Sequence, residues 1–253
     1  MNAHLKEPGG KVRLYVGAPL GMDTRVVPDP GQAHYLLNVM RAREGDRVSL
    51  FNGHDGEWSA RLTDVNKRGC ALICEAQSRV QQETPDVWLC FAPVKKTPAD
   101  YIVQKATELG VSRLQPVVTR RTIVSRVNLE RMRANAIEAA EQSDRLTVPD
   151  IRDPVSLDRL LADWLPTRRL LFCDEAGEAA HIASAIGNVT PGPVGLLTGP
   201  EGGFDPAERA AVRTCNFVLP VSLGPRILRA DTAALAALAI WQALRGDWQC
   251  IGI

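Results

Sequence analysis

The sequence predicts an α/β protein in two parts, a small N-terminal β-barrel domain and a larger, mostly parallel α/β domain. Three observations predict this. Short β-type runs separated by turn residues fill the first 80 or so residues, and strands alternate with helices after them. The strands of the second part are continuous apolar runs, as in a sheet buried on both faces. A Gln-, Glu- and Pro-containing segment, residues 78–85, separates the parts, so we place the domains at 1–80 and 81–253.

The first part should contain four strands and one helix. The strands are predicted over residues 12–16, 47–51, 57–65 and 70–76, with turns at 44–46, 52–53 and 55–56. The helix is predicted over Gln32–Arg43, because that span places Leu36, Leu37, Val39 and Met40 on one side and is followed by Gly45. This pattern predicts a small barrel with one short helix.

In the second part, five buried strands are predicted over residues 87–94, 113–119, 169–174, 194–198 and 217–223. Helices are expected over 97–109, 128–143 and 232–244, and one more should begin after Asp205. Thr97 is the predicted cap of the first of these helices. Asp205 is the predicted cap of the helix that follows it, with Pro206 in the first position of that helix and Glu208 able to close a capping box. Alternation of this kind predicts a parallel sheet.

Composition limits the class of protein. Hydrophobic residues make up 45% and charged residues 23%, which excludes a disordered or collagen-like chain. No apolar run approaches the length of a membrane helix, and the N-terminal residues lack a signal peptide's apolar core, so a cytoplasmic protein is expected. The six cysteines form no CxxC pair, which favours reduced thiols and no metal site.

The first candidate loop is LLTGPEGGF, residues 196–204, directly after a predicted buried strand. Its three glycines allow a ligand to approach the backbone closely, and ligands of open α/β sheets bind at the carboxyl ends of strands. The loop is not a P-loop, because no Gly-Lys-Ser/Thr follows, and its glycines are not spaced as GxGxxG. From the glycines alone, an ordinary strand-to-helix turn remains an equal alternative.

The second candidate loop, residues 219–232, also leaves a predicted strand. Gly224-Pro225 forces a tight turn, Arg226 and Arg229 follow, and Asp231-Thr232 opens the last helix. Two arginines and a carboxylate beside a glycine-rich loop are typical of a site for an anionic substrate. The alternative is helix capping by Asp231 or Thr232 with arginines that face solvent.

Both loops closely resemble the two signature motifs of the SPOUT-class methyltransferases, TGPEGGF at 198–204 and LGPRILRADTAAL at 223–235. The best match is the ribosomal RNA small-subunit methyltransferase E family. Residues 34–46 look like that family's N-terminal PUA-like domain, and 105–111 and 141–149 look like its central segments, so the resemblance extends in order over nearly the whole chain. One departure is Asp231, where the family usually has Glu.

The resemblance implies a C-terminal trefoil knot, a homodimer with its site near the dimer interface, and a reaction. That reaction is methylation of N3 of a uridine in the decoding region of 16S ribosomal RNA. The methyl donor would be S-adenosyl-L-methionine, bound in a bent form and held mainly by backbone groups. The residues expected to bind it are Leu197, Thr198, Gly199, Pro200, Glu201, Gly202, Gly203, Leu219, Leu223, Gly224, Ile227, Leu228 and Thr232.

The implied chemistry needs two catalytic tasks. N3 of uracil carries a proton at neutral pH, so the enzyme must present a flipped-out base to the methyl group and stabilise charge at N3. Arg229 is the first candidate, because a guanidinium beside O2 or O4 would stabilise the imide anion. Asp231 would accept the proton or hold Arg229, and a helix-capping role is an equal alternative for it. Glu201 would more simply organise its own loop.

The net charge of +1 conceals a local basic excess, because residues 113–133 contain six arginines against one glutamate. Aromatic residues make up only 5%, so backbone and shape recognition should dominate over base stacking. The predicted RNA-binding residues are Lys11, Arg13, Arg25, Arg41, Lys95, Lys96, Arg120, Arg121 and Arg226.

Two alternative functions remain open at this stage. The first is ribose 2′-O-methylation of transfer or ribosomal RNA, a reaction of related knotted enzymes, which the full-length match opposes. The second is a non-catalytic RNA-binding assembly protein that has kept the fold.

Overall fold

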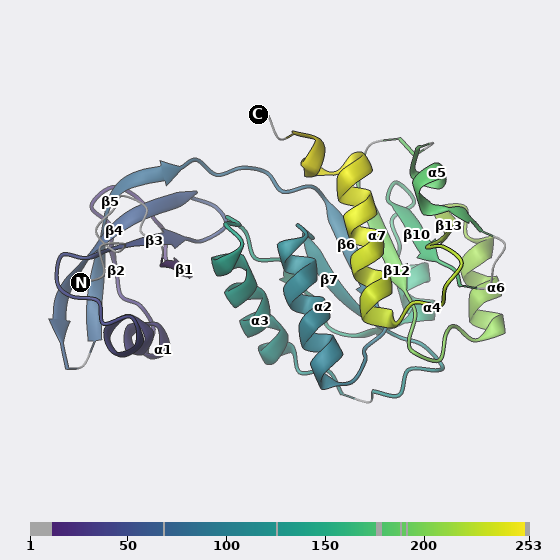
Figure 1. Cartoon of the computed structure of the whole chain (residues 1–253), viewed down its shortest axis with the longest axis horizontal. Coiled ribbons are helices and arrows are strands. Elements are labelled where there is room, and N and C mark those ends of the chain that lie inside the picture. The colour runs from purple at the N-terminus through teal and green to yellow at the C-terminus, as the bar shows by residue number, and fades with distance from the viewer. Residues whose placement is uncertain are drawn as a thin grey trace. The chain divides into compact units, whose positions relative to one another are not determined.

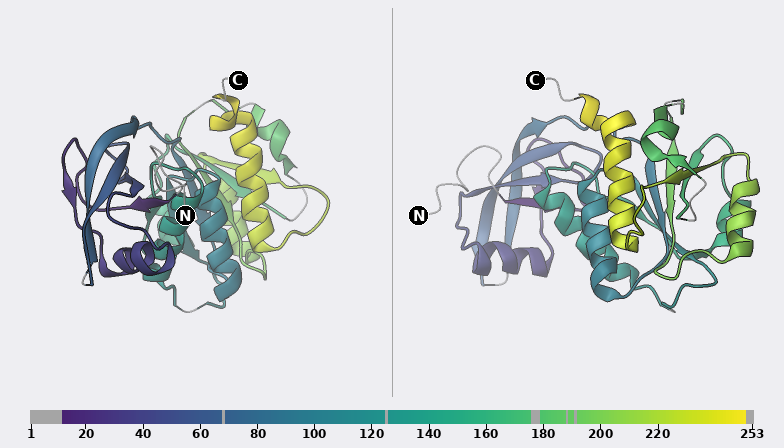
Figure 2. Two further views of the ribbon diagram at one scale, coloured as in Figure 1. Left: turned by 60° about the vertical axis from the view of Figure 1, so that its left-hand side comes forward. Right: turned by 45° about the vertical axis from the view of Figure 1, so that its right-hand side comes forward.

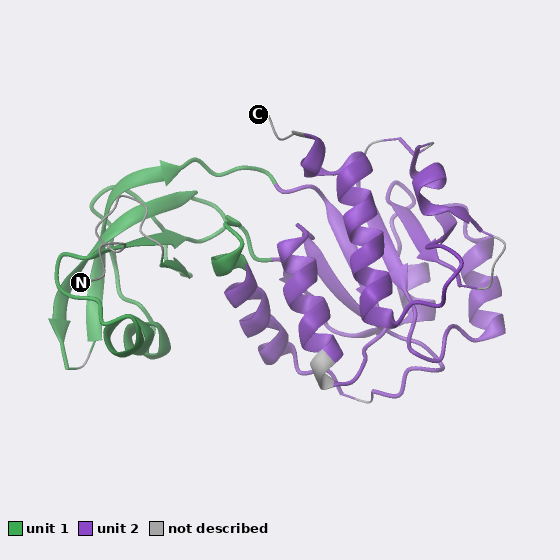
Figure 3. Cartoon of the chain, in the orientation of Figure 1, with its two compact units in different colours: residues 1–83, 140–148 green, residues 84–139, 149–253 purple. Residues whose placement is uncertain are grey.

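The computed structural model describes residues 12–67, 69–124, 126–175, 179–187, 189–190 and 192–250. The chain forms two compact units, residues 1–83 with 140–148 and residues 84–139 with 149–253 (Figure 3). Residues 140–148 join the first unit because Ala140 and Leu146 pack against Phe51 in one buried cluster. A single boundary near residue 80 therefore does not describe this division.

The first unit contains one five-stranded sheet. Its strands are β1 (Arg13–Tyr15), β2 (Arg25–Val26), β3 (Arg47–Phe51), β4 (Glu57–Asn66) and β5 (Gly69–Arg79), in the order β1-β3-β4-β5-β2. The β1–β3 pair is parallel and the other pairs are antiparallel. The four predicted strands are present. The two-residue strand β2 is too short to show periodicity, so it was not predicted.

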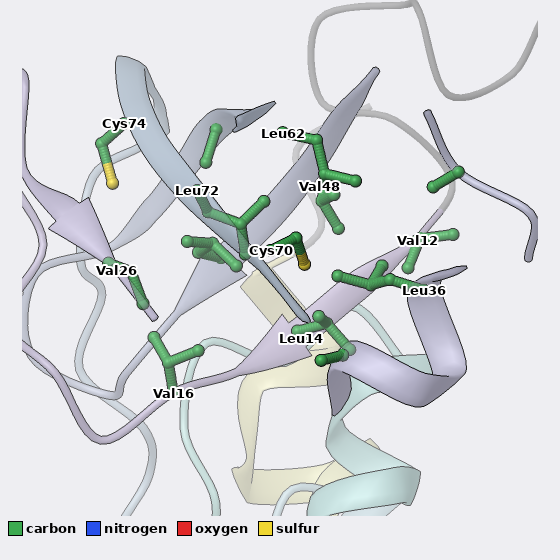
Figure 4. Close-up of a cluster of buried hydrophobic side chains, with 14 of the residues drawn as sticks. Val12, Leu14, Val16, Val26, Leu36, Val48, Leu62, Cys70, Leu72 and Cys74 are labelled. Carbon is green, nitrogen blue, oxygen red and sulfur yellow. The ribbon is translucent and has the colours of Figure 1, made fainter. Parts of the chain in front are cut away.

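Alternate side chains of these strands form the core of the first unit. Leu14, Val48, Leu62 and Leu72 pack together with Leu36 of the adjoining helical turns (Figure 4). Each of the five is 0–2% exposed. Because these positions are buried, they are apolar, and their spacing in the sequence indicated the strands and the helix.

The helical segment of the first unit differs from its prediction. It begins as α1 (Pro30–His34), where Asp29 and Gln32 form a capping box, and continues as a π-helical segment (Tyr35–Val39). The Met40 N–H donates to the Tyr35 carbonyl at 2.9 Å, and Arg41 then takes a positive φ of 55°. The helix therefore begins two residues before the predicted start and ends before Arg43, because the chain leaves the helical region at Arg41.

Gly56 lies where a side chain cannot fit. Its φ is +76°, and a Cβ would lie 2.2 Å from the Arg79 carbonyl oxygen and 2.9 Å from the Gln81 nitrogen, both backbone atoms. We expect Gly56→Ala to lower the free energy of unfolding of the first unit by about 2–4 kcal/mol. The change in this free energy is measured by urea denaturation, with hydrogen exchange of peptides from this unit as the readout. Gly17→Ala is the matched control, since a Cβ there has nothing within 4 Å.

The second unit is built on a parallel sheet. Its strands are β6 (Val87–Phe91), β7 (Arg113–Val118), β8 (Asp150–Ile151), β9 (Val155–Ser156), β10 (Arg169–Cys173), β11 (Ala180–His181), β12 (Val194–Thr198) and β13 (Val218–Ser222). The order is β11-β13-β10-β12-β6-β7-β8, with β9 paired to β7, and all pairs are parallel. The five predicted strands are present, and the two-residue strands β8, β9 and β11 were not predicted.

Helices cover this sheet. They are α2 (Lys96–Glu108), α3 (Leu129–Gln142), α4 (Leu157–Ala162), α5 (Ile182–Gly187), α6 (Pro206–Thr214) and α7 (Ala230–Arg245), followed by a 3₁₀ turn (Asp247–Cys250). Helix α7 packs against α2, α5 and β12 (Figures 1 and 2). Helices α4 and α6 supply Leu160 and Val212 to a separate buried cluster with Phe172. Among the described helices, none is long and apolar enough to cross a membrane.

The helix starts test the predicted caps. The capping box of Asp205 and Glu208 on α6 is confirmed. The predicted cap at Thr97 is wrong, because α2 already begins at Lys96 and its N-cap is Lys95. Helix α7 begins at Ala230, two residues before its predicted start, and its N-cap Arg229 makes no side-chain cap bond.

The strand order determines where a site can form. Strand β10 lies between β13 and β12, so the carboxyl ends of these three parallel strands are adjacent. Both candidate loops leave this edge, after β12 and β13, and the segment after β10 leaves it beside them. Ligands of open α/β sheets bind at such an edge.

Candidate functional site

A cavity of about 370 Å³ lies at the carboxyl ends of β10, β12 and β13. Four stretches of the chain line it, residues 173–175, 198–201 with 204, 222–230, and 233. The two loops that the sequence singled out therefore meet in one cavity, and its volume lies within the range of pockets for small molecules and cofactors.

The predicted cofactor residues divide into two groups. Eight line the cavity, namely Thr198, Gly199, Pro200, Glu201, Leu223, Gly224, Ile227 and Leu228. Five do not belong to its described lining, namely Leu197, Gly202, Gly203, Leu219 and Thr232. Leu197 is fully buried in the core, and Leu219 lines a second cavity beside β10. Segment 173–175 was not predicted, although the carboxyl end of the predicted strand 169–174 was a usable signal.

The glycine-rich loop requires its glycines for two local reasons. A Cβ on Gly199 would lie 2.6 Å from the Phe204 ring, which packs edge-on against Phe172 at a centroid distance of 4.9 Å. Gly203 has a φ of +67°, and its N–H donates to the Pro200 carbonyl at 2.9 Å. The loop is thus a tight turn whose backbone forms one wall of the cavity.

A buried carboxylate stabilises the base of this site. Asp174 lines the cavity with a side chain only 1% exposed, and it accepts hydrogen bonds from Arg209 Nε at 2.7 Å and Arg213 Nη1 at 2.5 Å. Both arginines belong to α6, so the pairs tie that helix to the end of β10. Burial raises the pKa of the neighbouring Cys173 thiol to about 12, so this cysteine is a neutral lining residue and not a nucleophile at neutral pH.

The mouth of the cavity is charged. Glu175, Glu201, Arg226 and Arg229 line it and are exposed, and Ile227 between the two arginines is 89% exposed. The two glutamates come from the ends of β10 and β12, and the two arginines come from the loop after β13. Acidic and basic side chains therefore both line this cavity.

The two predicted catalytic residues occupy different positions. Arg229 lines the cavity, whereas Asp231 lies half-buried in the first turn of α7 and is outside the described lining. The Asp231 carboxylate accepts a hydrogen bond from the Thr232 N–H at 2.7 Å. Within the described part of the chain no ion pair joins Arg229 to Asp231, so the idea that Asp231 holds Arg229 finds no contact here.

Most predicted RNA-binding residues are exposed cations. Arg41, Lys95 and Arg226 are exposed, and Arg25 pairs with Asp64 at 2.9 Å on the surface of the first unit. Arg120 and Arg121 are exposed beside the glycine-rich loop. Lys11 and the side chain of Lys96 lie outside the described residues.

Arg13 corrects one of these predictions. Its side chain is 6% exposed, and Nη2 pairs with Glu57 Oε2 at 2.9 Å. Its remaining donors reach the carbonyls of Ala140 at 2.9 Å, Glu141 at 3.1 Å and Arg145 at 2.7 Å. Because the guanidinium is buried and fully engaged, Arg13 is a core residue of the first unit and not a phosphate contact.

The acid that caps α6 is also part of the loop's electrostatics. The Ala207 N–H, together with the nearby charges of Arg120 and Arg121, lowers the pKa of Asp205 below its ordinary value. Asp205 is therefore ionised at neutral pH.

Of the described residues, no three His, Cys, Asp or Glu side chains form a group that could hold a metal ion.

Comparison with known proteins identifies related sequences over both units. Residues 81–242 match the RNA methyltransferase domain family, and residues 27–74 match the RNA methyltransferase PUA domain family. A relative from Synechocystis, named ribosomal RNA small subunit methyltransferase E, is 34% identical over 92% of this chain and 77% of its own. A protein of the same name from Rickettsia conorii is 30% identical over 90% of this chain and 93% of its own.

Solved structures extend the likeness to the fold. A ribosomal RNA small subunit methyltransferase E from Neisseria gonorrhoeae, bound to S-adenosyl methionine, aligns with a TM-score of 0.84 at 29% identity and covers 94% of this chain and 99% of that one. A methyltransferase from Legionella pneumophila in complex with the same cofactor aligns with a TM-score of 0.83 at 29% identity, over 92% and 97%. These likenesses confirm the predicted fold class, a SPOUT trefoil-knot α/β domain preceded by a PUA-like domain.

Proposed function

The chain belongs to the ribosomal RNA small subunit methyltransferase E family, and on that premise we propose that it transfers a methyl group from S-adenosyl-L-methionine to small-subunit ribosomal RNA. The observation that carries the proposal is the cavity in which the two family motifs meet, at the carboxyl ends of β10, β12 and β13. The finer proposal is that the acceptor is N3 of one uridine in the decoding region of 16S ribosomal RNA.

The lining fits the proposed cofactor. S-adenosyl-L-methionine carries a sulfonium, an ammonium and a carboxylate, so it has a net positive charge in need of acidic neighbours. Glu175 and Glu201, which line the cavity, supply negative charge. Gly199 and Gly224 leave the backbone accessible, and Leu223 with Leu228 offers apolar walls to an adenine. When bound, this group supplies an electrophilic methyl on a sulfonium.

The residues of this chain would then orient the acceptor base and control its charge. Uracil N3 becomes nucleophilic only when its proton leaves, and the resulting negative charge spreads to O2 and O4. The exposed Arg229 guanidinium at the cavity stabilises that charge. Asp231, in the first turn of α7, is the proposed proton acceptor.

RNA contact is proposed for exposed cations of both units. These are Arg25, Arg41, Lys95, Arg120 and Arg226, with Lys11 and Lys96 added from the sequence. Within the second unit, the basic stretch 113–133 begins in β7 and continues past its carboxyl end, which lies along the same edge of the sheet as the cavity. We also propose a homodimer in the cytoplasm, which the family resemblance of the two loop motifs supports.

Titration calorimetry with S-adenosyl-L-methionine tests the proposed cofactor directly. We expect one site per chain with a dissociation constant in the micromolar range, since a cavity of about 370 Å³ can enclose a ligand of this size. The product of methyl transfer, S-adenosylhomocysteine, should compete for the site. A folded protein that binds neither compound would favour the non-catalytic assembly role instead.

A further inference from the structure

The turn after β7 contacts the glycine-rich loop, although 81 to 88 residues separate the bonded positions in sequence. Arg121 Nη1 donates to the Gly202 carbonyl at 3.0 Å. The Arg120 N–H donates to Glu208 Oε1 at 2.9 Å, and the Arg120 guanidinium pairs with Asp205 at 3.0 Å. We call residues 119–122 the β7 turn. Its three contacts span the cofactor loop from Gly202 to the start of α6.

The β7 turn is held in shape by its own hydrogen bonds. The Thr122 N–H donates to the Thr119 carbonyl at 3.0 Å, the Thr119 N–H donates to Thr122 Oγ1 at 2.9 Å, and the two hydroxyls are 3.0 Å apart. Glu208, which receives the Arg120 N–H, is only 6% exposed and also closes the capping box of α6. The base from which Arg121 reaches the loop is therefore fixed.

Gly202 lies directly against Arg121. A Cβ on Gly202 would be 3.7 Å from Arg121 Cβ, so the stem of the arginine packs on the outer side of the loop. Gly202 belongs to the tight turn between Pro200 and Gly203, and Pro200 and Glu201 of that turn line the cavity. A charged donor on the Gly202 carbonyl therefore acts on the cavity wall from behind.

From this geometry we propose that Arg121 is a positioning residue for the cofactor wall, and not simply a contact to RNA phosphate. The inference rests on the proposed cofactor. By holding the Gly202 carbonyl, Arg121 keeps the Pro200–Gly203 turn in its binding geometry before any RNA arrives. Its side chain does not enter the cavity lining, so it acts through the loop. Arg120 differs, because its link to the buried Glu208 is made by the backbone.

Calorimetry of the full-length protein without RNA tests this assignment. We expect Arg121→Ala to weaken S-adenosyl-L-methionine binding about tenfold, the effect of losing one charge-assisted hydrogen bond. Arg121→Lys, which retains a charged donor, should bind within about threefold of wild type. Arg120→Ala keeps the N–H bond to Glu208 and loses only an exposed ion pair, so its affinity should stay within about twofold. Arg159→Ala, which removes an exposed pair on α4, is the matched surface control.

Steady-state kinetics separate positioning from general damage. Arg121→Ala should raise KM for S-adenosyl-L-methionine about tenfold and leave kcat at saturating cofactor within about threefold. Arg121→Met, which keeps the aliphatic stem on Gly202 without the donor, gives the same test if the alanine variant is unstable. Unchanged cofactor affinity together with a raised KM for RNA would overturn the proposal in favour of a phosphate contact. If wild type itself binds no S-adenosyl-L-methionine, the proposed function fails and not this assignment alone.

Discussion

Replacement of Arg229 by alanine is expected to lower the methyl-transfer rate by about two to three orders of magnitude, the effect of removing one donor that stabilises developing negative charge. Arg229 is exposed at the cavity and, as N-cap of α7, makes no side-chain cap bond, so its guanidinium is available to a base. Initial rates with purified small ribosomal subunits measure the loss. The unfolding temperature should stay near wild type, because the guanidinium forms no buried pair.

Two further variants separate the roles of the neighbouring residues. Arg226→Ala removes an exposed cation three positions earlier in the same loop, so it should raise KM for RNA and change kcat by less than about fivefold. Asp231→Asn still offers an oxygen to the Thr232 N–H, so a fall in rate would assign proton acceptance to the lost carboxylate. Near-normal methyl transfer by a folded Arg229→Ala protein would remove Arg229 from the chemistry.

Arg13→Met is expected to lower the free energy of unfolding of the first unit by about 3–5 kcal/mol, since it leaves a buried carboxylate without its main partner. Arg13 and Glu57 have side chains only 6% and 7% exposed, and Arg79 reaches Glu57 only at 3.5 Å. The same change also removes the donors to the carbonyls of Ala140 and Arg145, so segment 140–148 loses these hydrogen bonds to β1. Hydrogen exchange of peptides from residues 12–79 and 140–148 measures the loss.

Two controls accompany Arg13→Met: the same substitution at an exposed ion pair, and a double variant that removes both charges of the buried pair. Arg25→Met removes a pair whose side chains are 52% and 62% exposed, so the expected cost is below about 1 kcal/mol. The double variant Arg13→Met with Glu57→Met should recover most of the lost stability, because it leaves no unpaired buried charge. If Arg13→Met cost no more than Arg25→Met, the buried pair would not stabilise the first unit.

The sequence predicted best the elements whose pattern is local. Strand β12 was predicted with its observed bounds, because a continuous apolar run ends at a glycine-rich turn, and the α6 capping box was readable from Asp205 and Glu208. Two-residue strands such as β2 and β11 leave no periodicity to read. The start of α7 was misplaced because its N-cap, Arg229, lacks the side-chain bond that marks most helix starts.

Features that depend on distant partners could not be predicted. Arg13 was expected at the surface because its carbonyl partners lie 127 to 132 residues further along the chain. The contact of Arg121 with Gly202 spans 81 residues and shows no local signal. The two loop motifs identified most of the residues that line the cavity. Segment 173–175 carries no motif, and it lines the cavity because β10 lies between β12 and β13 in the sheet. The cofactor and the acceptor base came from the family resemblance, since periodicity says nothing of either.

The most direct test of the central claim is mass spectrometry of small-subunit ribosomal RNA from a strain that lacks this protein. Our account predicts the loss of a single N3-methyluridine in the decoding region, restored by the wild-type chain and not by Arg229→Ala. Loss of a ribose 2′-O-methyl group instead would assign the chain to the other knotted chemistry. An unchanged modification profile would contradict the account.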